Sequence, residues 1–184
     1  MSNYPQQIGP WTCLDSTSVY DNKWLNVRHE NVITPGGTTG IYGVIHFKSR
    51  AIAILPIDEH NHTWLVKQFR YTLNEYSWEL PMGGAPLDED PLLGAQRELQ
   101  EETGLTAAHW QCLMKLHTSN SVTDEEGYVF VARELSAGDQ ALEPSEDIEL
   151  MRLPLDEAVQ MVIDGEITDA ISVAALLRMA VLNK

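Results

Sequence analysis

The sequence predicts an α/β protein: a layered mixed sheet with helices on both faces, preceded by a small N-terminal antiparallel β-sheet. Two observations lead to this fold class. Segments with alternating or β-branched apolar residues, typical of strands, recur between residues 11 and 80 and again after residue 107. Helical segments follow in the middle and at the end of the chain, and strands flanked in this way favour a layered arrangement.

The first 48 residues are expected to form a separate antiparallel sheet. Strands are predicted near 11–20, 23–33 and 41–47, with the proline- and glycine-rich run 35–40 as the turn before the third. A segment of this size has too few large apolar side chains to bury a core by itself. We therefore expect it to pack on the rest of the chain or on a second subunit, which makes a homodimer the predicted assembly.

Residues 49–184 are expected to form the main domain, because the strands here are more apolar than those of the N-terminal segment. Two helices close the chain, one ending at Gly165 and one capped by Thr168. The predicted strands are 51–58, 62–69, 76–80, 108–117, 127–134 and 146–152, and the predicted closing helices are 155–164 and 168–182.

A helix over 91–103 is the most sharply bounded element of the sequence. Asp90 is a good N-cap, and Pro91 occupies the first helical position, where proline is tolerated. Gly104 supplies the left-handed residue that ends the last turn. Residues 92, 95, 99 and 103 recur at helical spacing and are expected to face the sheet.

Composition excludes several classes of partner. The formal net charge is −15 with only twelve Lys and Arg residues, which disfavours nucleic acid and anionic membranes. The N-terminus lacks a signal peptide and no run reaches about 18 apolar residues, so we expect a cytoplasmic protein without a membrane span. Cys13 and Cys112 are far apart and are expected to be reduced packing residues.

Three glutamates on the central helix are the first candidate site. Glu98 and Glu102 are four residues apart, so both carboxylates lie on one face and can reach a single ion, with Glu101 nearby. Without a cation these charges would repel one another, and oxygen donors without His or Cys favour Mg²⁺ or Mn²⁺ over zinc. Taken alone, two such glutamates also fit a solvated helix face.

The residues around these glutamates resolve the choice. The segment GGAPLDEDPLLGAQRELQEETGL, residues 83–105, resembles the Nudix box, G-x5-E-x7-R-E-U-x-E-E-x-G-U with U aliphatic. The resemblance implies a Nudix α/β/α sandwich and Mg²⁺-dependent hydrolysis of a nucleoside diphosphate linked to another moiety. The matching residues are Gly83, Glu89, Arg97, Glu98, Leu99, Glu101, Glu102, Gly104 and Leu105.

The resemblance also implies residue roles. Glu98 and Glu102 match the principal metal ligands of the family, and Glu101 shares a metal or orients water. Arg97 is expected to fix these carboxylates. The main-chain carbonyl of Met82 is expected to supply a further oxygen ligand.

Beyond the box, the chain resembles the ADP-ribose pyrophosphatase-like Nudix enzymes. The segments VKQFRY, WELPMGG and TDEEGYVFVARELSAG carry this likeness. In that subgroup the matching arginine contacts the diphosphate and the matching glutamate lines the substrate pocket, which here are Arg70 and Glu79. A catalytic glutamate on a loop after the box matches Glu125, with Asp124 or Glu126 as neighbours that could take its place.

The N-terminal segment is similar to the dimerisation element of the same subgroup, which supplies aromatic side chains that hold the base. Trp11 and Tyr42 are the candidates, and Trp24 is the alternative. A structural role in a core or an interface stays open for each of the three.

The resemblance implies hydrolysis of ADP-ribose or a related nucleoside diphosphate sugar to a nucleoside monophosphate and a sugar phosphate. Enzymes devoted to ADP-ribose commonly carry a proline about fifteen residues past the box, where this chain has Asn120. GDP-mannose or a dinucleoside polyphosphate is therefore an alternative substrate. An alternative of another class is a Nudix module that senses a nucleotide without cleaving it.

Overall fold

The structure is a computed structural model that describes residues 4–142 and 147–183. The chain divides into two compact units. Unit 1 consists of the described residues up to Ser49 together with Ser119–Glu125, and unit 2 consists of the described residues of Arg50–Thr118 and of the chain from Glu126 onwards. The division that the sequence predicts, 1–48 and 49–184, did not anticipate that a later segment joins the first unit.

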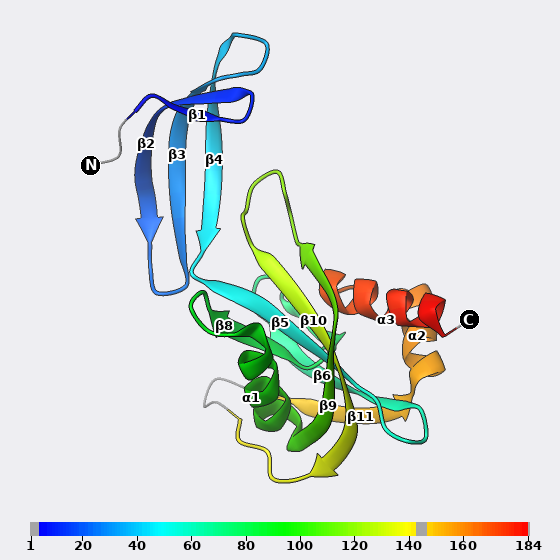
Figure 1. Cartoon of the computed structure of the whole chain (residues 1–184). Coiled ribbons are helices and arrows are strands. Elements are labelled where there is room, and N and C mark those ends of the chain that lie inside the picture. The colour runs from blue at the N-terminus through cyan, green and yellow to red at the C-terminus, as the bar shows by residue number, and fades with distance from the viewer. Residues whose placement is uncertain (1–3, 143–146, 184) are drawn as a thin grey trace. The chain divides into compact units, whose positions relative to one another are not determined.

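Unit 1 contains the predicted small sheet. Its strands are paired antiparallel in the order β1-β2-β3-β4. Strand β1 was not predicted, because it is only three residues long. The chain turns from β1 into β2 at Gly9, whose φ of +54° suits glycine. The strands are β1 (Gln6–Ile8), β2 (Trp11–Asp21), β3 (Leu25–Ile33) and β4 (Thr39–Phe47), and Figure 1 shows them in blue and cyan.

Unit 2 contains a mixed sheet and a second, antiparallel sheet. In the mixed sheet, ordered β8-β5-β10-β9, strand β10 pairs parallel with β5 and antiparallel with β9. The second sheet has the order β11-β6-β7. The strands are β5 (Ser49–Pro56), β6 (His62–Arg70), β7 (Glu75–Glu79), β8 (Met82–Pro86), β9 (Leu105–His117), β10 (Glu126–Ala137) and β11 (Glu149–Pro154).

The predicted strand 146–152 needs correction. Residue 146 lies outside the described residues, and β11 runs to Pro154, where its backbone still pairs with His62 of β6. The sequence also missed β8, because the residues Met82–Pro86 include two glycines and a proline, which are poor strand formers. Pairing with β5 in the mixed sheet outweighs that local preference.

The helices are α1 (Pro91–Thr103), α2 (Leu155–Ile163) and α3 (Ala170–Leu182). The predicted limits of α1 are confirmed: the Asp90 side chain accepts from the backbone N–H of Leu92, and Gly104 has a φ of 71°. The predicted cap of the last helix is wrong. Asp169, one residue after Thr168, caps α3 and accepts from the backbone N–H of Ser172 at 2.8 Å.

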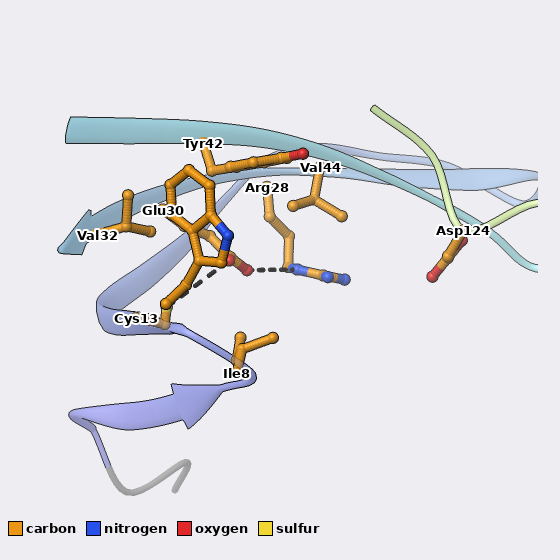
Figure 2. A pocket seen from close by; sticks show the side chains of 9 residues that line it. Ile8, Cys13, Arg28, Glu30, Val32, Tyr42, Val44 and Asp124 are labelled. Atoms are coloured by element: carbon orange, nitrogen blue, oxygen red, sulfur yellow. Dashed lines mark hydrogen bonds and ion pairs between the residues drawn. The ribbon is translucent and has the colours of Figure 1, made fainter. Parts of the chain in front are cut away.

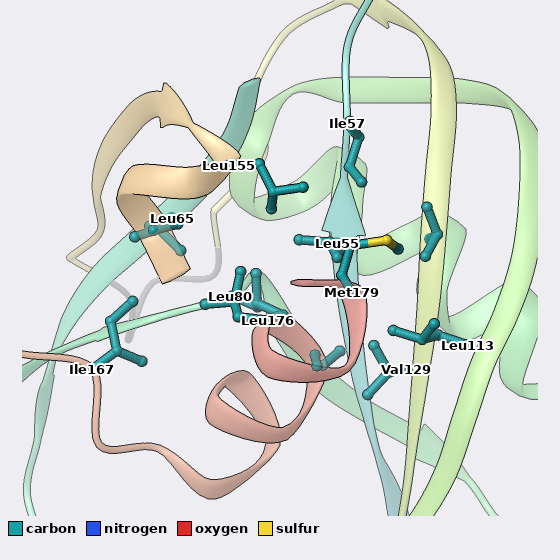
Figure 3. Close-up of a cluster of buried hydrophobic side chains, with 14 of the residues drawn as sticks. Leu55, Ile57, Leu65, Leu80, Leu113, Val129, Leu155, Ile167, Leu176 and Met179 are labelled. Carbon is teal, nitrogen blue, oxygen red and sulfur yellow. The ribbon is translucent and has the colours of Figure 1, made fainter. Parts of the chain in front are cut away.

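The mixed sheet is covered on both faces, as the sequence predicts. Along β5, Ile52 and Ile54 pack in one buried cluster with Ala95 and Leu99 of α1. The intervening residues, Ala53 and Leu55, point to the opposite face and pack in a second cluster with residues of α2, α3 and the second sheet. Figure 3 shows this second cluster, and Figure 1 shows α1 on one side of β5 and β10 and α2 and α3 on the other.

The prediction that both cysteines are packing residues is correct for Cys13 and wrong for Cys112. Cys13 is buried, but Cys112 is exposed on β9, so it is not a core packing residue. Alternation explains the error, because the neighbouring Leu113 takes the inward position on that strand. Among the described residues, no helix has the length and hydropathy that a membrane span requires.

Candidate active site

Helix α1 holds the predicted carboxylates in place by burying the residues beside them. Ala95 and Leu99 are fully buried against the sheet. Glu98 is 7% exposed and Glu102 is 1% exposed. Glu98 and Glu102 therefore do not lie on a solvent-exposed helix face. Charged groups are rarely buried in this way without a compensating partner.

Arg97 brings two of the carboxylates to one point. Its Nη1 donates to Oε1 of Glu98 at 2.6 Å and to Oε2 of Glu101 at 3.1 Å. Its Nη2 donates to the carbonyl oxygen of Gly84 at 2.7 Å, which ties α1 to β8. Burial works against the charge on Arg97, yet the carboxylates of Glu98 and Glu101 raise the pKa of this guanidinium. Arg97 therefore links Glu98, Glu101 and β8 in this structure, and its role in positioning the carboxylates stays a prediction.

Two backbone positions of β8, Met82 and Gly83, lie against the carboxylates of Glu102 and Glu98. The Met82 backbone N–H donates to Oε2 of Glu102 at 2.9 Å, so the Met82 main chain lies beside this carboxylate. A Cβ atom on Gly83 would lie 2.1 Å from the Glu98 carboxyl carbon. Only glycine therefore leaves room for Glu98 in its present position.

Carboxylate oxygens, the donor type on α1, are the ligands that a hard divalent cation prefers. Glu98 and Glu101 both bond to a single nitrogen of Arg97, which shows that their oxygens can converge on one positive centre. Oε2 of Glu89 is buried, 3.8 Å from Arg97 Nη2, and accepts no hydrogen bond from the residues described. Within residues 4–142 and 147–183, no group of three His, Cys, Asp or Glu side chains has an arrangement that could hold a metal ion.

Arg70 and Glu79, both predicted to contact substrate, lie side by side in unit 2. Arg70 Nε donates to Oε1 of Glu79 at 2.8 Å, and Nη2 pairs with the other carboxylate oxygen. The hydrogen bond to Glu79 raises the pKa of Arg70, with smaller contributions from Asp169 and Glu102. Glu79 is 2% exposed, so the guanidinium is the exposed end of this pair and is free to face an anionic ligand.

Trp11 and Tyr42, the predicted base-binding residues, lie together in unit 1. Their rings meet edge to face with centroids 5.5 Å apart. Both line a cavity of about 380 Å³ that also includes Ile8 and Val44 (Figure 2). Trp24 is 61% exposed and does not line this cavity.

A charged pair that the sequence did not predict, Arg28 and Glu30, lines the same cavity. Arg28 Nε donates to Oε1 of Glu30 at 3.1 Å, and Glu30 is buried (Figure 2). Burial, followed by the nearby Glu30 carboxylate, raises the pKa of the Cys13 thiol. Residues 28, 30 and 32 are alternate positions of β3, and alternate residues of a strand share one face. This spacing with the apolar Val32 could have predicted that Arg28 and Glu30 face inward.

Glu125, the predicted catalytic base, and Asn120 belong to the segment Ser119–Glu125 of unit 1. The backbone N–H of Glu125 donates to Oγ1 of Thr123 at 3.0 Å. Sequence reasoning also missed Arg50 of unit 2, whose Nη1 donates to the carbonyl oxygen of Leu87 at 2.7 Å in the turn before α1. No local pattern distinguishes Arg50 from a surface cation, because its partners lie far away in the sequence.

Comparison with known families matches residues 47–176 to the NUDIX domain and residues 11–45 to the nucleoside diphosphate sugar hydrolase N-terminal domain. An ADP-ribose pyrophosphatase of Mycobacterium tuberculosis is 33% identical over 168 residues, which cover 89% of this chain and 80% of that protein. An ADP-ribose pyrophosphatase of Bacillus subtilis is 32% identical over 154 residues, 83% of each chain. The crystal structure of an ADP compounds hydrolase superposes with a TM-score of 0.84 at 22% identity and 95% coverage of both chains.

The chain belongs to the Nudix family. It is a Nudix hydrolase, and the predicted likeness to ADP-ribose pyrophosphatases is confirmed by relatives that match most of its length. The predicted fold class is confirmed by the solved structure that it superposes on. Nudix hydrolases generally use divalent metal ions and cleave diphosphate bonds in small nucleoside diphosphate compounds, so the chemistry to be explained is diphosphate hydrolysis.

Proposed function

We propose that the protein is a Mg²⁺-dependent pyrophosphatase that cleaves ADP-ribose, or a related nucleoside diphosphate sugar, to a nucleoside monophosphate and a sugar phosphate. The observation that carries the proposal is the pair of ADP-ribose pyrophosphatase relatives, each at least 32% identical over more than four fifths of this chain. The match of residues 11–45 to the N-terminal domain of nucleoside diphosphate sugar hydrolases supports the same substrate class.

Glu98, Glu101 and Glu102 would hold the metal, with the Met82 carbonyl as a further oxygen ligand; Mn²⁺ is chemically close enough to replace Mg²⁺. Divalent metal supplies charge neutralisation at the diphosphate and makes water a better nucleophile. Arg97 fixes the direction of the Glu98 and Glu101 carboxylates through the hydrogen bonds described above.

Charge and shape govern the remaining roles. Arg70 is held by a buried carboxylate, so its guanidinium is oriented before substrate arrives and can pair with phosphoryl oxygens. Glu79 keeps Arg70 in that orientation. Glu125 is proposed to take the proton from the attacking water. Trp11 and Tyr42 offer aromatic surfaces for the base.

Asn120 leaves the sugar and the base open, so GDP-mannose and dinucleoside polyphosphates are the alternative substrates. The experiment is a panel of these compounds incubated with purified protein and Mg²⁺, with products identified by chromatography. Release of AMP and ribose 5-phosphate from ADP-ribose at the highest kcat/KM supports the proposal. Absence of turnover for every diphosphate in the panel refutes it.

We also propose a cytoplasmic homodimer. Exposed apolar side chains are frequent on the sheet of unit 1, which buries little of its own surface and would gain from a partner. Sedimentation analysis at micromolar protein tests the assembly: a single species of about 41 kDa, twice the mass of one chain, is expected. A 20.6 kDa species throughout that range would contradict it.

A further inference from the structure

The loop Ser119–Glu125, which carries the proposed catalytic base, is docked on strand β4 of the N-terminal sheet. The backbone N–H of Ile45 donates to the carbonyl oxygen of Val122 at 2.8 Å, and the N–H of Asp124 donates to the carbonyl oxygen of Ile45 at 3.3 Å. Ile45 and Thr123 accordingly form a parallel β-bridge. This segment is called the docked loop below.

Side chains fix the docked loop at both ends. Asp124 accepts from the backbone N–H of Phe47 through Oδ1 at 3.1 Å and pairs with His46 Nδ1 through Oδ2 at 2.5 Å. Nearer the start of the loop, the Tyr42 hydroxyl donates to the carbonyl oxygen of Ser121 at 2.8 Å. The contacts therefore span β4 from Tyr42 to Phe47.

The contacts lie directly before the proposed base. Glu125 follows Asp124 in the chain, so the Asp124 contacts determine where the Glu125 backbone starts from. Small displacements of a catalytic group cost up to about a hundredfold in rate. The His46–Asp124 pair is partly exposed, so its contribution to overall stability is expected to be small. A role in positioning is thus easier to reconcile with this geometry than a role in holding the sheet together.

We propose that β4 positions the catalytic loop of this Nudix hydrolase, with Asp124 as the central positioning residue and His46 and Tyr42 as its supports. The inference rests on the proposed function of Glu125. The sheet of unit 1 would then have two roles, contact with the base and positioning of the docked loop. Tyr42 belongs to both roles, because its ring lines the cavity and its hydroxyl holds the loop.

The first measurement is independent of catalysis. Hydrogen–deuterium exchange compares wild type with Asp124→Ala, and the amides of Ile45 and Asp124 are expected to exchange at least about tenfold faster in the variant, because the loop opens more often. Asp21→Ala is the matched control: Asp21 is another exposed carboxylate of unit 1, paired with Lys48 at 2.7 Å. Its removal should leave exchange at both amides unchanged.

The second measurement is steady-state kinetics with the best substrate of the panel. Asp124 also lines the cavity, but the proposed base-binding rings of Trp11 and Tyr42 remain in Asp124→Ala, so this variant should lower kcat about tenfold and change KM much less. Asp124→Asn should keep at least about half of kcat, since an amide oxygen still accepts from Phe47 and the amide nitrogen can donate to His46. Tyr42→Phe loses only the bond to Ser121 and should lower kcat about threefold.

The outcomes separate the competing explanations. Normal kcat in Asp124→Ala, with or without faster exchange, overturns the inference. Equal losses in Asp124→Asn and Asp124→Ala also overturn it, because they would show that Asp124 acts through its charge, as a base in place of Glu125. A wild-type protein with no turnover refutes the proposed function and the catalytic purpose of docking together, while the exchange data still report whether the loop is held by Asp124.

Discussion

The two units of the chain differ in how their candidate functional residues are supported. In the described part of unit 1, the buried residues are Cys13, Glu30 and Val32. Unit 2 contains two clusters of buried apolar residues, one on each face of the mixed sheet. The carboxylates of α1 thus stand on a packed core, whereas Trp11 and Tyr42 stand on a thin sheet.

The residues proposed for the chemical step on α1 and those proposed for recognition of the base lie on different sides of this division. A helix packed on a core keeps its side chains in fixed positions, which suits groups that must act in the reaction. A thin sheet tolerates adjustment, which suits apolar contacts to a ligand. We therefore expect variants of α1 and β8 to change kcat and variants of the cavity rings to change KM, with the docked loop as the exception already described.

The largest effect is expected for Glu102→Gln. The amide keeps the volume and the acceptor for the Met82 N–H but loses the charge needed to hold a divalent cation. We expect kcat to fall about a thousandfold, which corresponds to several kcal/mol of lost transition-state stabilisation. The melting temperature should change little. Glu157→Gln, at an exposed position on α2, is the control, and near-normal rates in Glu102→Gln would refute the role of this residue.

Gly83→Ala should have the second largest effect. The new methyl group would displace the Glu98 carboxyl group, which is the movable end of a flexible side chain. We therefore expect about a hundredfold loss of kcat with less than about 1 kcal/mol of lost stability. Steady-state kinetics and thermal unfolding test this pair of effects. Gly36→Ala has room for the methyl group and should behave as wild type. Equal kcat values for the two variants would contradict displacement of Glu98 as the cause of the loss.

A smaller effect is expected in unit 1 and concerns KM. Trp11→Ala removes one of the two rings that line the cavity and should raise KM about tenfold with little change in kcat, the size of a lost stacking contact. Trp24→Ala removes an equally large ring that does not line the cavity and should leave KM within about twofold. Initial rates over a range of substrate concentrations separate the two. A larger effect from Trp24 would reverse the assignment.

The smallest effect leaves activity unchanged and concerns the pH dependence of stability. Burial opposes ionisation of Asp58, but backbone N–H groups of His62 and His60 and the Arg152 guanidinium lower the pKa of this carboxyl. Because its pKa is lower in the folded state than in the unfolded state, Asp58 stabilises the fold above the ordinary aspartate pKa. That stabilisation is lost as pH falls through the folded-state pKa.

Urea denaturation of wild type and Asp58→Asn at pH 6 and pH 3 measures this contribution. We expect the variant to be less stable than wild type by about 2 kcal/mol at pH 6, the typical value of hydrogen bonds to a charged group. At pH 3 the difference in free energy of unfolding between wild type and Asp58→Asn should be smaller. A gap that widens on acidification would contradict the sign derived for Asp58.

The sequence by itself determined α1 and the residue types of the candidate site. Asp90, Pro91 and Gly104 mark the helix ends through contacts with their own neighbours, so local chemistry is sufficient to place them. The spacing of Glu98 and Glu102 likewise follows from the helical repeat. The order of the predicted elements, with strands flanked by a helix in mid-chain and helices at the end, was also enough to predict a sheet covered on both faces.

Only the tertiary structure decided which groups meet across large sequence separations. Local composition gave the wrong environment for Cys112, because the neighbouring Leu113 takes the inward position on β9. The contacts of His46 with Asp124 and of Arg50 with Leu87 join residues 78 and 37 positions apart. Such pairs leave no periodic trace in the sequence, since they depend on where the chain returns and not on its local repeat.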